Sequence, residues 1–134
     1  MTQRSTLTIG QVASQAGVNL QTVRYYQRRN LIAQPPKPAS GYRRYAADTV
    51  ERIRFIKRAQ GLGFSLDEIR ELLALGDGHC DDVRRVAERQ RALIAARIAD
   101  LDAMQQTLDT LIDDCRQSHP AGYCPLIESL SHQD

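Results

Sequence analysis

The sequence predicts an all-α fold with a small wing, in which a winged helix-turn-helix domain is followed by a long helix. Apolar residues recur at helical spacing in most segments, one proline-rich interruption follows the second helix, and residues 81–115 contain neither Pro nor Gly. We expect residues 1–75 to form the winged domain. Residues 76–115 should form a linker and the long helix, and residues 116–134 a loop and a short helix.

Capping residues mark the first two helices. Thr8 and Gln11 have the capping-box pattern, and Gly17 stands where the first helix should end. Asn19 can cap a second helix, which should fade near Asn30. Two short helices joined by a short turn that contains glycine are typical of a helix-turn-helix.

A proline-rich segment interrupts the helices. Three prolines and a glycine fall within residues 33–41, and a helix does not tolerate that composition. We expect residues 42–45 to be extended, so that loop and strand together form a wing. A third helix should run from about Ala47 to Leu62. A second capping box at Ser65 should open a fourth helix, which ends before Gly76.

The long helix carries a stripe that advances by alternating steps of three and four residues. Its members are Val83, Ala87, Gln90, Ile94, Arg97, Leu101, Met104, Leu108 and Leu111. This spacing is that of a coiled-coil seam, and the chain that follows is too short to cover a helix of ~50 Å. We therefore expect a homodimer. The residues expected to face the partner chain are Ile94, Leu101, Met104, Leu108 and Leu111.

Charge is divided unevenly along the chain. Residues 1–60 hold eleven Lys and Arg against two Asp and Glu, whereas residues 61–134 hold seven Arg against fourteen acidic residues. A basic half favours a polyanionic partner, with nucleic acid as the first candidate and a solvated basic face as the alternative. Nothing indicates an enzyme, because no nucleophile–base pair and no phosphate-binding glycine loop stands out.

The three cysteines carry the most specific chemistry. The sequence contains neither a secretory signal nor a membrane-spanning apolar run, so we expect a cytoplasmic protein with no membrane partner. In the cytoplasm an odd number of cysteines favours free thiols or metal ligands over a disulfide framework. Cys80 precedes the long helix, Cys115 lies at its far end, and Cys124 follows an eight-residue loop. Cys80 and Cys115 of one chain should lie roughly 50 Å apart, so they cannot share a metal ion.

An antiparallel dimer brings these cysteines together. Cys80 of one chain then meets Cys115 and Cys124 of its partner, at two sites related by the two-fold axis. Three thiolates favour a soft metal ion, whereas zinc would recruit His79, His119 or water as a fourth ligand. The alternatives are cysteines that serve as small buried hydrophobic residues, or a redox switch that forms a disulfide between the second and third cysteines.

The motifs resemble the MerR family of transcription activators over essentially the whole chain. Residues 18–26 resemble the family's recognition helix, residues 41–45 its wing, and residues 62–69 the segment before its coiled-coil helix. The resemblance implies an antiparallel homodimer that binds promoter double-stranded DNA and bends and untwists it for RNA polymerase. The expected DNA contacts are Gln21, Thr22, Arg24, Tyr25, Tyr26, Arg43, Arg44 and Tyr45, with Tyr26 serving the core or the DNA backbone.

The cysteine pattern resembles that of the metal-responsive members. A cysteine at position 80 resembles the divalent-metal sensors, and the spacing of Cys115 and Cys124 before Pro125 resembles the mercury-responsive members. The resemblance implies Hg(II) as the effector, leaves Pb(II), Cd(II) and Zn(II) open, and implies no organic cofactor. Asn30 departs from the family, which usually has glycine there, but asparagine tolerates a left-handed backbone best after glycine.

Overall fold

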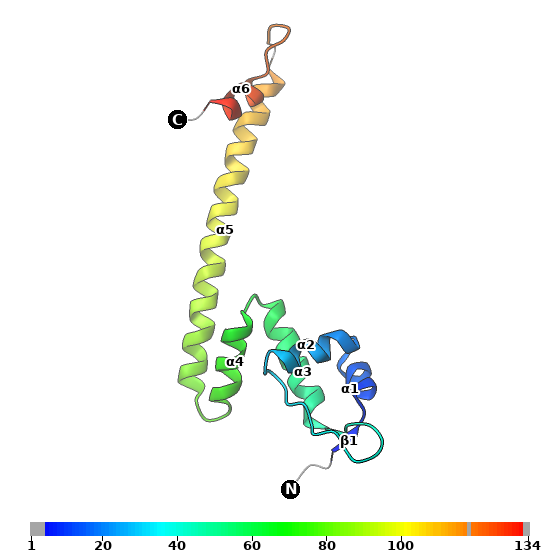
Figure 1. Ribbon diagram of the computed structural model, residues 1–134. Helices are drawn as coiled ribbons and strands as arrows, with labels where there is room; N and C mark the ends of the chain where they lie inside the picture. Colours follow the sequence, from blue (N-terminus) through cyan, green and yellow to red (C-terminus); the bar gives the residue numbers. More distant parts are fainter. Residues whose placement is uncertain (1–4, 118, 133–134) are drawn as a thin grey trace. The chain divides into compact units, whose positions relative to one another are not determined.

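The computed structural model describes residues 5–117 and 119–132 (Figure 1). The chain forms two compact units, Met1–Val86 and Ala87–Asp134. The division into three segments that the sequence suggests stays a prediction. The elements, in order, are β1 (Ser5–Leu7), α1 (Ile9–Ala16), α2 (Leu20–Arg28), β2 (Tyr45–Ala46), α3 (Asp48–Gly61), α4 (Leu66–Leu75), α5 (Cys80–Arg116) and α6 (Pro125–Ser131).

The helix-turn-helix forms where its capping residues predict it. The Gln11 backbone N–H donates to Thr8 Oγ1 over 3.2 Å, and the Thr8 backbone N–H donates to Gln11 Oε1 over 2.9 Å. Gly17 ends α1 with a left-handed φ of 71°, a conformation that glycine adopts without strain. Asn19 Oδ1 accepts a hydrogen bond from the Thr22 backbone N–H over 2.8 Å and so begins α2.

The turn after α2 is also as expected. Asn30 has a φ of 58°, and it is the one non-glycine residue with positive φ in the part of the chain that the structure describes. Leu31 and Ile32 follow at once and are buried. The left-handed turn therefore directs the chain from the exposed end of α2 into the core.

The wing differs in detail from the expectation. The strand β2 begins at Tyr45, the last residue of the segment expected to be extended, and pairs antiparallel with β1. Leu7 lies opposite Tyr45, and Ser5 lies opposite Ala46. The strand β1 was not predicted, because three residues are too short to show an alternating pattern.

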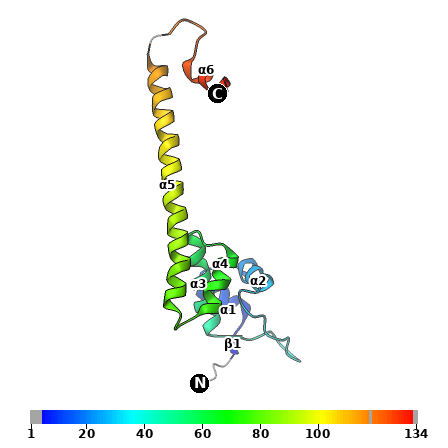
Figure 2. The ribbon, with the colours of Figure 1, turned by 90° about the vertical axis from the view of Figure 1, so that its left-hand side faces the viewer.

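The first unit has one core, to which α1, α2, α3 and α4 all contribute (Figure 2). Ser65 and Glu68 form the second capping box, which opens α4. The core residues that are fully shielded from solvent come from each of these helices and from the turn after α2. They are Val12, Val23, Leu31, Ile53, Ile56 and Ile69.

Four basic side chains of α3 and α4 bind backbone carbonyls at or just beyond the ends of α1 and α2. A helix leaves its last carbonyls without intrahelical donors, and a cation close to them is stabilising. Part of the basic excess in the first half therefore holds the domain together instead of facing a partner. The pairs are Arg52 with Leu31, Arg54 with Gln15, Lys57 with Gly17, and Arg70 with Arg29.

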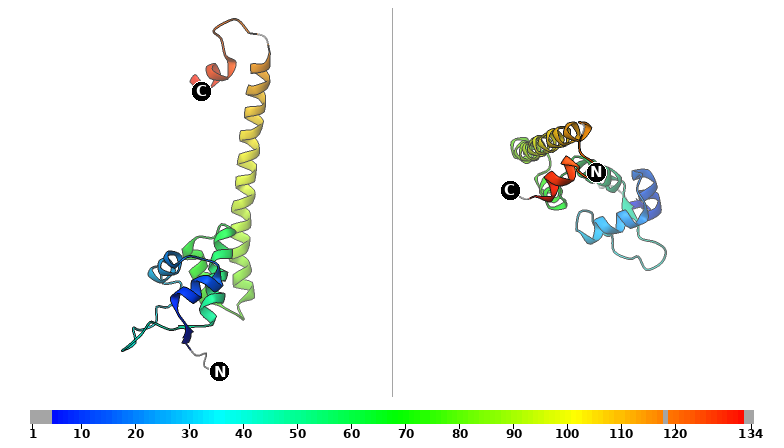
Figure 3. Two further views of the ribbon diagram at one scale, coloured as in Figure 1. Left: turned by 90° about the vertical axis from the view of Figure 1, so that its right-hand side faces the viewer. Right: turned by 90° about the horizontal axis from the view of Figure 1, so that it is seen from above.

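The long helix α5 spans 37 residues. Four of the five residues expected at the dimer interface are exposed apolar side chains, whereas Leu111 is buried within its own chain. After α5 the chain reverses direction, and α6 returns beside the last turns of α5 (Figure 3). The four exposed residues of the expected interface are Ile94, Leu101, Met104 and Leu108.

Among the described residues, no helix is long and apolar enough to cross a membrane.

Candidate metal centre and nucleic-acid interface

Two of the three cysteines meet at the end of α5. Cys115 lies in the last turn of α5, and Cys124 is the residue immediately before α6. Their Sγ atoms are 3.9 Å apart, and both thiols are free. The reversal of the chain between them depends on Gly122, whose φ is 83°, and on a bond from the Tyr123 backbone N–H to the Pro120 carbonyl. The loop therefore presents two sulfur atoms as a pair.

Cys80 occupies the opposite end of the same helix. It is the first residue of α5 and is exposed. A helix rises ~1.5 Å per residue, so the helix itself separates Cys80 from Cys115 by roughly 50 Å. The fold brings together the second and third predicted ligands of one chain and leaves the first at a distance.

The two paired thiols have different acidities. The hydrogen bond to Cys124 raises the pKa of the Cys115 thiol. The backbone N–H of Ile127, at the start of α6, lowers the pKa of Cys124, and the Cys115 thiol lowers it further. The charged form is thus stabilised on Cys124 and the proton is held on Cys115. A thiolate is the form that binds metals, and of these two candidate ligands Cys124 is the one that ionises more readily.

Neither nearby histidine bonds a cysteine in the described part of the chain. His119 Nε2 bonds the Asp114 carbonyl, and its ring packs edge-on against Tyr123 with centroids 5.8 Å apart. His79 lies 3.8 Å from an Asp82 carboxylate oxygen. Across residues 5–117 and 119–132, no three His, Cys, Asp or Glu side chains gather into a group that could hold a metal ion.

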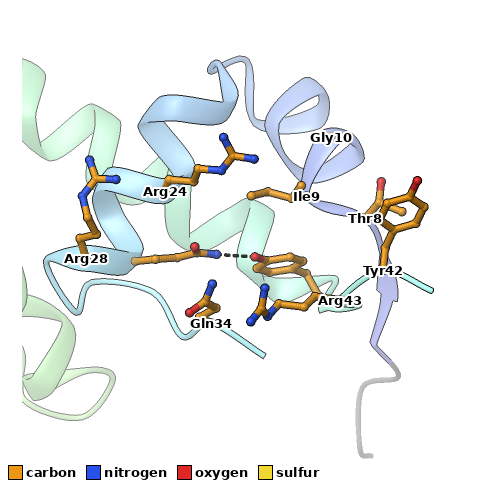
Figure 4. Close-up of a pocket in the computed structure, with 10 residues that line it drawn as sticks. Thr8, Ile9, Gly10, Arg24, Arg28, Gln34, Tyr42 and Arg43 are labelled. Atoms are coloured by element: carbon orange, nitrogen blue, oxygen red, sulfur yellow. Dashed lines mark hydrogen bonds between the residues drawn. The ribbon is translucent and has the colours of Figure 1, made fainter. Parts of the chain in front are cut away.

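A basic cleft separates α2 from the wing. Its volume is about 600 Å³, and it is bounded by the start of α1, by one face of α2 and by the segment that leads into β2 (Figure 4). Arg24 and Arg28 line it from α2, and Arg43 lines it from the wing. Arg43 Nε is anchored by a 2.9 Å bond to the Pro35 carbonyl. Three arginines lining one open cleft suit the phosphates of a polyanion.

Arg28 is the arginine of this cleft that sequence reasoning missed. It follows Arg24 by one helical turn, and that spacing places both side chains on one face of α2. The Arg28 guanidinium also lies 6.0 Å from the Tyr25 ring centroid, within range of a cation–π contact. The spacing of four residues was the signal that could have found it.

The residues expected to contact DNA fall into three groups by exposure. Tyr26 and Tyr45 are 3% and 2% exposed, so their rings belong to the core. Thr22 is half-buried and donates to Asn19 Oδ1 over 2.8 Å, and Arg43 is half-buried in the cleft wall. The exposed residues are Gln21, Arg24, Tyr25 and Arg44.

A winged helix-turn-helix beside a basic cleft is the architecture of winged helix-turn-helix DNA-binding proteins, and the chain is related to this class. The model of the MerR HTH family regulatory proteins matches residues 7–75, and a second model, described as MerR, DNA binding, matches residues 50–111. The chain belongs to the MerR family of helix-turn-helix transcription regulators. It is accordingly a DNA-binding regulator and not an enzyme.

Similar proteins agree in sequence and in fold. The mercuric resistance operon regulatory protein of Pseudomonas fluorescens is 47% identical over 125 residues, which cover 92% of this chain and 87% of that protein. The lead(II) complex of the transcription regulator PbrR691 from Ralstonia metallidurans CH34 has a TM-score of 0.79 at 28% identity, covering 92% and 98%. The mercury(II) complex of the dual function regulator MerR from Bacillus megaterium MB1 has a TM-score of 0.74 at 36% identity, covering 94% and 100%.

Proposed function

We propose that this chain is a mercury-responsive transcription regulator. It binds promoter DNA as an antiparallel homodimer and activates transcription by distorting that DNA when Hg(II) is bound. The observation that carries the proposal is the pair of sulfur atoms of Cys115 and Cys124, 3.9 Å apart beside the start of α6. The similarity to regulators named for mercuric resistance supports Hg(II) as the effector.

The third ligand in this proposal is Cys80 of the partner chain. Two thiols are fewer than the three or four ligands of typical protein sites for soft metals. The length of α5 prevents Cys80 of the same chain from joining them. The exposed apolar side chains of Leu101 and Met104 favour burial against a second copy of α5. With the two helices antiparallel, each end of the dimer receives Cys80 from one chain and two cysteines from the other.

The donor set fits a soft ion. Sulfur ligands select soft metals, and the lowered pKa of Cys124 favours the thiolate that such a metal needs. A bound ion supplies a link between the thiols of the two chains. Within this proposal α5 carries the constraint toward the winged domain, whose basic cleft holds the DNA, and RNA polymerase then engages the bent and untwisted promoter. Pb(II), Cd(II) and Zn(II) are the competing effectors, and the lead(II)-bound relative supports the first of these.

A mixed dimer tests the ligand arrangement. One chain carries Cys80→Ala, and the other carries Cys115→Ala together with Cys124→Ala. If the ligands come from both chains, one end of this heterodimer keeps all three thiols and the other end loses all three. We expect the heterodimer to bind one Hg(II) with three sulfur ligands, measured by X-ray absorption, and each mutant homodimer to show no such site. A heterodimer without a three-sulfur site would show that the ligands come from one chain.

Transcription in the presence of different ions identifies the effector. The wild-type chain, RNA polymerase and the promoter DNA are combined with Hg(II), Pb(II), Cd(II) or Zn(II) in turn. We expect Hg(II) to activate at the lowest concentration. A stronger response to another ion would reassign the effector without changing the ligand arrangement.

The 3.9 Å separation also favours a second candidate function, a thiol redox switch. Cys115 and Cys124 could close a disulfide with only a small movement, because a disulfide needs about 2 Å between its sulfur atoms. Mass analysis after mild oxidation, followed by transcription without added metal, separates the two functions. Activation by oxidation alone, with no response to any ion, would favour the redox switch.

A further inference from the structure

Two tyrosine–glutamine hydrogen bonds in the first unit run in opposite directions. Tyr26 Oη donates to Gln60 Oε1 over 2.6 Å. In the second pair the glutamine is the donor, because Gln27 Nε2 donates to Tyr45 Oη (Figure 4, dashed line). A phenolic hydroxyl has one proton to donate and can also accept. The direction of each bond therefore decides whether the tyrosine hydroxyl already donates its proton to the glutamine or can still donate it to another acceptor.

Tyr26 has no proton left for a ligand. Its ring is 3% exposed, its hydroxyl proton is directed to Gln60, and burial raises the pKa of Tyr26. The bond joins α2 to α3, two helices of the same core. Tyr26 is thus a core residue whose polar end is satisfied within the domain.

Tyr45 keeps its proton. Its hydroxyl accepts from Gln27, so the O–H remains available to a second acceptor. The ring is 2% exposed and fixed by the core and by the pairing of β2 with β1. Both Gln27 and Tyr45 line the basic cleft between α2 and the wing, so the bonded hydroxyl lies at the wall of that cleft. The Tyr45 oxygen already accepts a hydrogen bond from Gln27, and its ring is rigid, so its O–H can donate to an acceptor in the cleft.

The positive charge of the cleft indicates which kind of acceptor would bind this hydroxyl. Arg24, Arg28 and Arg43 line the same cleft, and their charges attract an anion. On the DNA-binding face of a transcription regulator, the anion is a backbone phosphate. Phosphate oxygens accept from arginine and from hydroxyl groups, and these contacts fix the register of the protein on the duplex.

We propose that Gln27 is a positioning residue for DNA binding. It orients the Tyr45 hydroxyl so that the hydroxyl donates to one phosphate held in the cleft. The inference rests on the proposed function only in that this face must bind DNA. Gln27 also joins the recognition helix to the wing, so the same bond holds these two DNA-contacting elements in a fixed spacing.

Substitution of single phosphates tests the proposal. A duplex that the wild-type chain selects from random sequences is prepared with one phosphate at a time replaced by neutral methylphosphonate. We expect one position at which the wild-type affinity falls about tenfold, because a hydrogen bond to a charged acceptor is lost. At that position the loss should shrink to about twofold in Tyr45→Phe and in Gln27→Met, as expected when the hydroxyl contact is already weakened or absent.

A double-mutant cycle separates positioning from direct contact. If Gln27 acts through Tyr45, the double variant Gln27→Met/Tyr45→Phe should bind unmodified DNA as Tyr45→Phe does. Additive losses would show that Gln27 contacts DNA by itself and would overturn the proposal. Full phosphate sensitivity in Gln27→Met would overturn it as well, and this variant covers the case in which Tyr45→Phe does not fold.

The second tyrosine–glutamine pair provides the matched control. Tyr26→Phe and Gln60→Met should reduce thermal stability and leave the position and size of the phosphate effect unchanged. An equal change in the phosphate profile for both pairs would indicate a purely structural role. A wild-type chain that selects no duplex would contradict the proposed function, which is a result distinct from any of these.

Discussion

The thiols of Cys115 and Cys124 face each other over 3.9 Å and differ in acidity. The hydrogen bond between them raises the pKa of Cys115, whereas the backbone of α6 lowers the pKa of Cys124. One short loop thus gives two chemically identical side chains different acidities.

This difference predicts an order of chemical modification. In the metal-free protein near neutral pH, iodoacetamide should alkylate Cys124 faster than Cys115, because alkylation requires the thiolate and a lowered pKa supplies it. As the pH falls, the reaction at Cys115 should be lost first. Mass spectrometry of timed digests measures both rates. In Cys124→Ala, Cys115 should react faster than in the wild type, since the bond that raises its pKa is gone; an unchanged rate would contradict this explanation.

The apolar stripe of α5 predicts a dimer that one charge can disrupt. Leu101 is 63% exposed in the single chain. Leu101→Asp should weaken dimerisation by several kcal/mol, because an unpaired carboxylate would be buried in the interface. Sedimentation at decreasing concentration measures the effect. Ala103→Asp, an exposed position off the stripe, is the control and should leave the dimer intact; dissociation of both variants alike would show that the stripe is wrongly assigned.

The salt dependence of DNA binding should distinguish the basic residues of the first unit that contact DNA from those that bond backbone carbonyls within the domain. Arg44→Ala should weaken binding to every DNA sequence and lower the slope of log K against log salt by about one contact. Arg52→Ala removes the 2.7 Å bond to the Leu31 carbonyl. It should cost about 1 kcal/mol of unfolding free energy and leave the slope unchanged. Urea unfolding and salt-dependent binding measure the two effects, and the same slope change in both variants would contradict the division.

Asn30 should tolerate glycine but not alanine. Its φ of 58° lies in the left-handed region, where a β-carbon without a polar side chain is disfavoured. Asn30→Ala should destabilise the chain by about 1 kcal/mol, and Asn30→Gly should be close to neutral. Thermal or urea unfolding of both variants provides the comparison, and equal losses would remove backbone strain as the cause.

Much of the fold could be predicted because its signals are local. Thr8, Asn19 and Ser65 each act on a backbone group within three residues, so their helix starts can be found by inspection. The strand β1 could not be found in this way, because it is three residues long and its partner β2 lies some forty residues further along the chain. The bond between Gln27 and Tyr45 was missed for a similar reason, since it joins α2 to the wing across 18 residues of chain.

The candidate metal centre was predictable to a similar extent. Cys115 and Cys124 are close in the sequence, and a loop with Pro120 and Gly122 favours a reversal that joins them. Placing Cys80 requires a second chain, so the ligand set as a whole stays a proposal. The acidities of the two thiols depend on backbone groups of α6 and could not be read from residue types.

The long side chains of α3 and α4 that reach the ends of α1 and α2 set a limit on protein engineering. A designer who wished to transfer the DNA specificity to another scaffold would be inclined to graft only the helix-turn-helix. That fragment would leave behind the donors of Arg52, Arg54, Lys57 and Arg70 and most of the apolar surface against which it packs. The smallest portable reader of DNA in this chain therefore extends through α4.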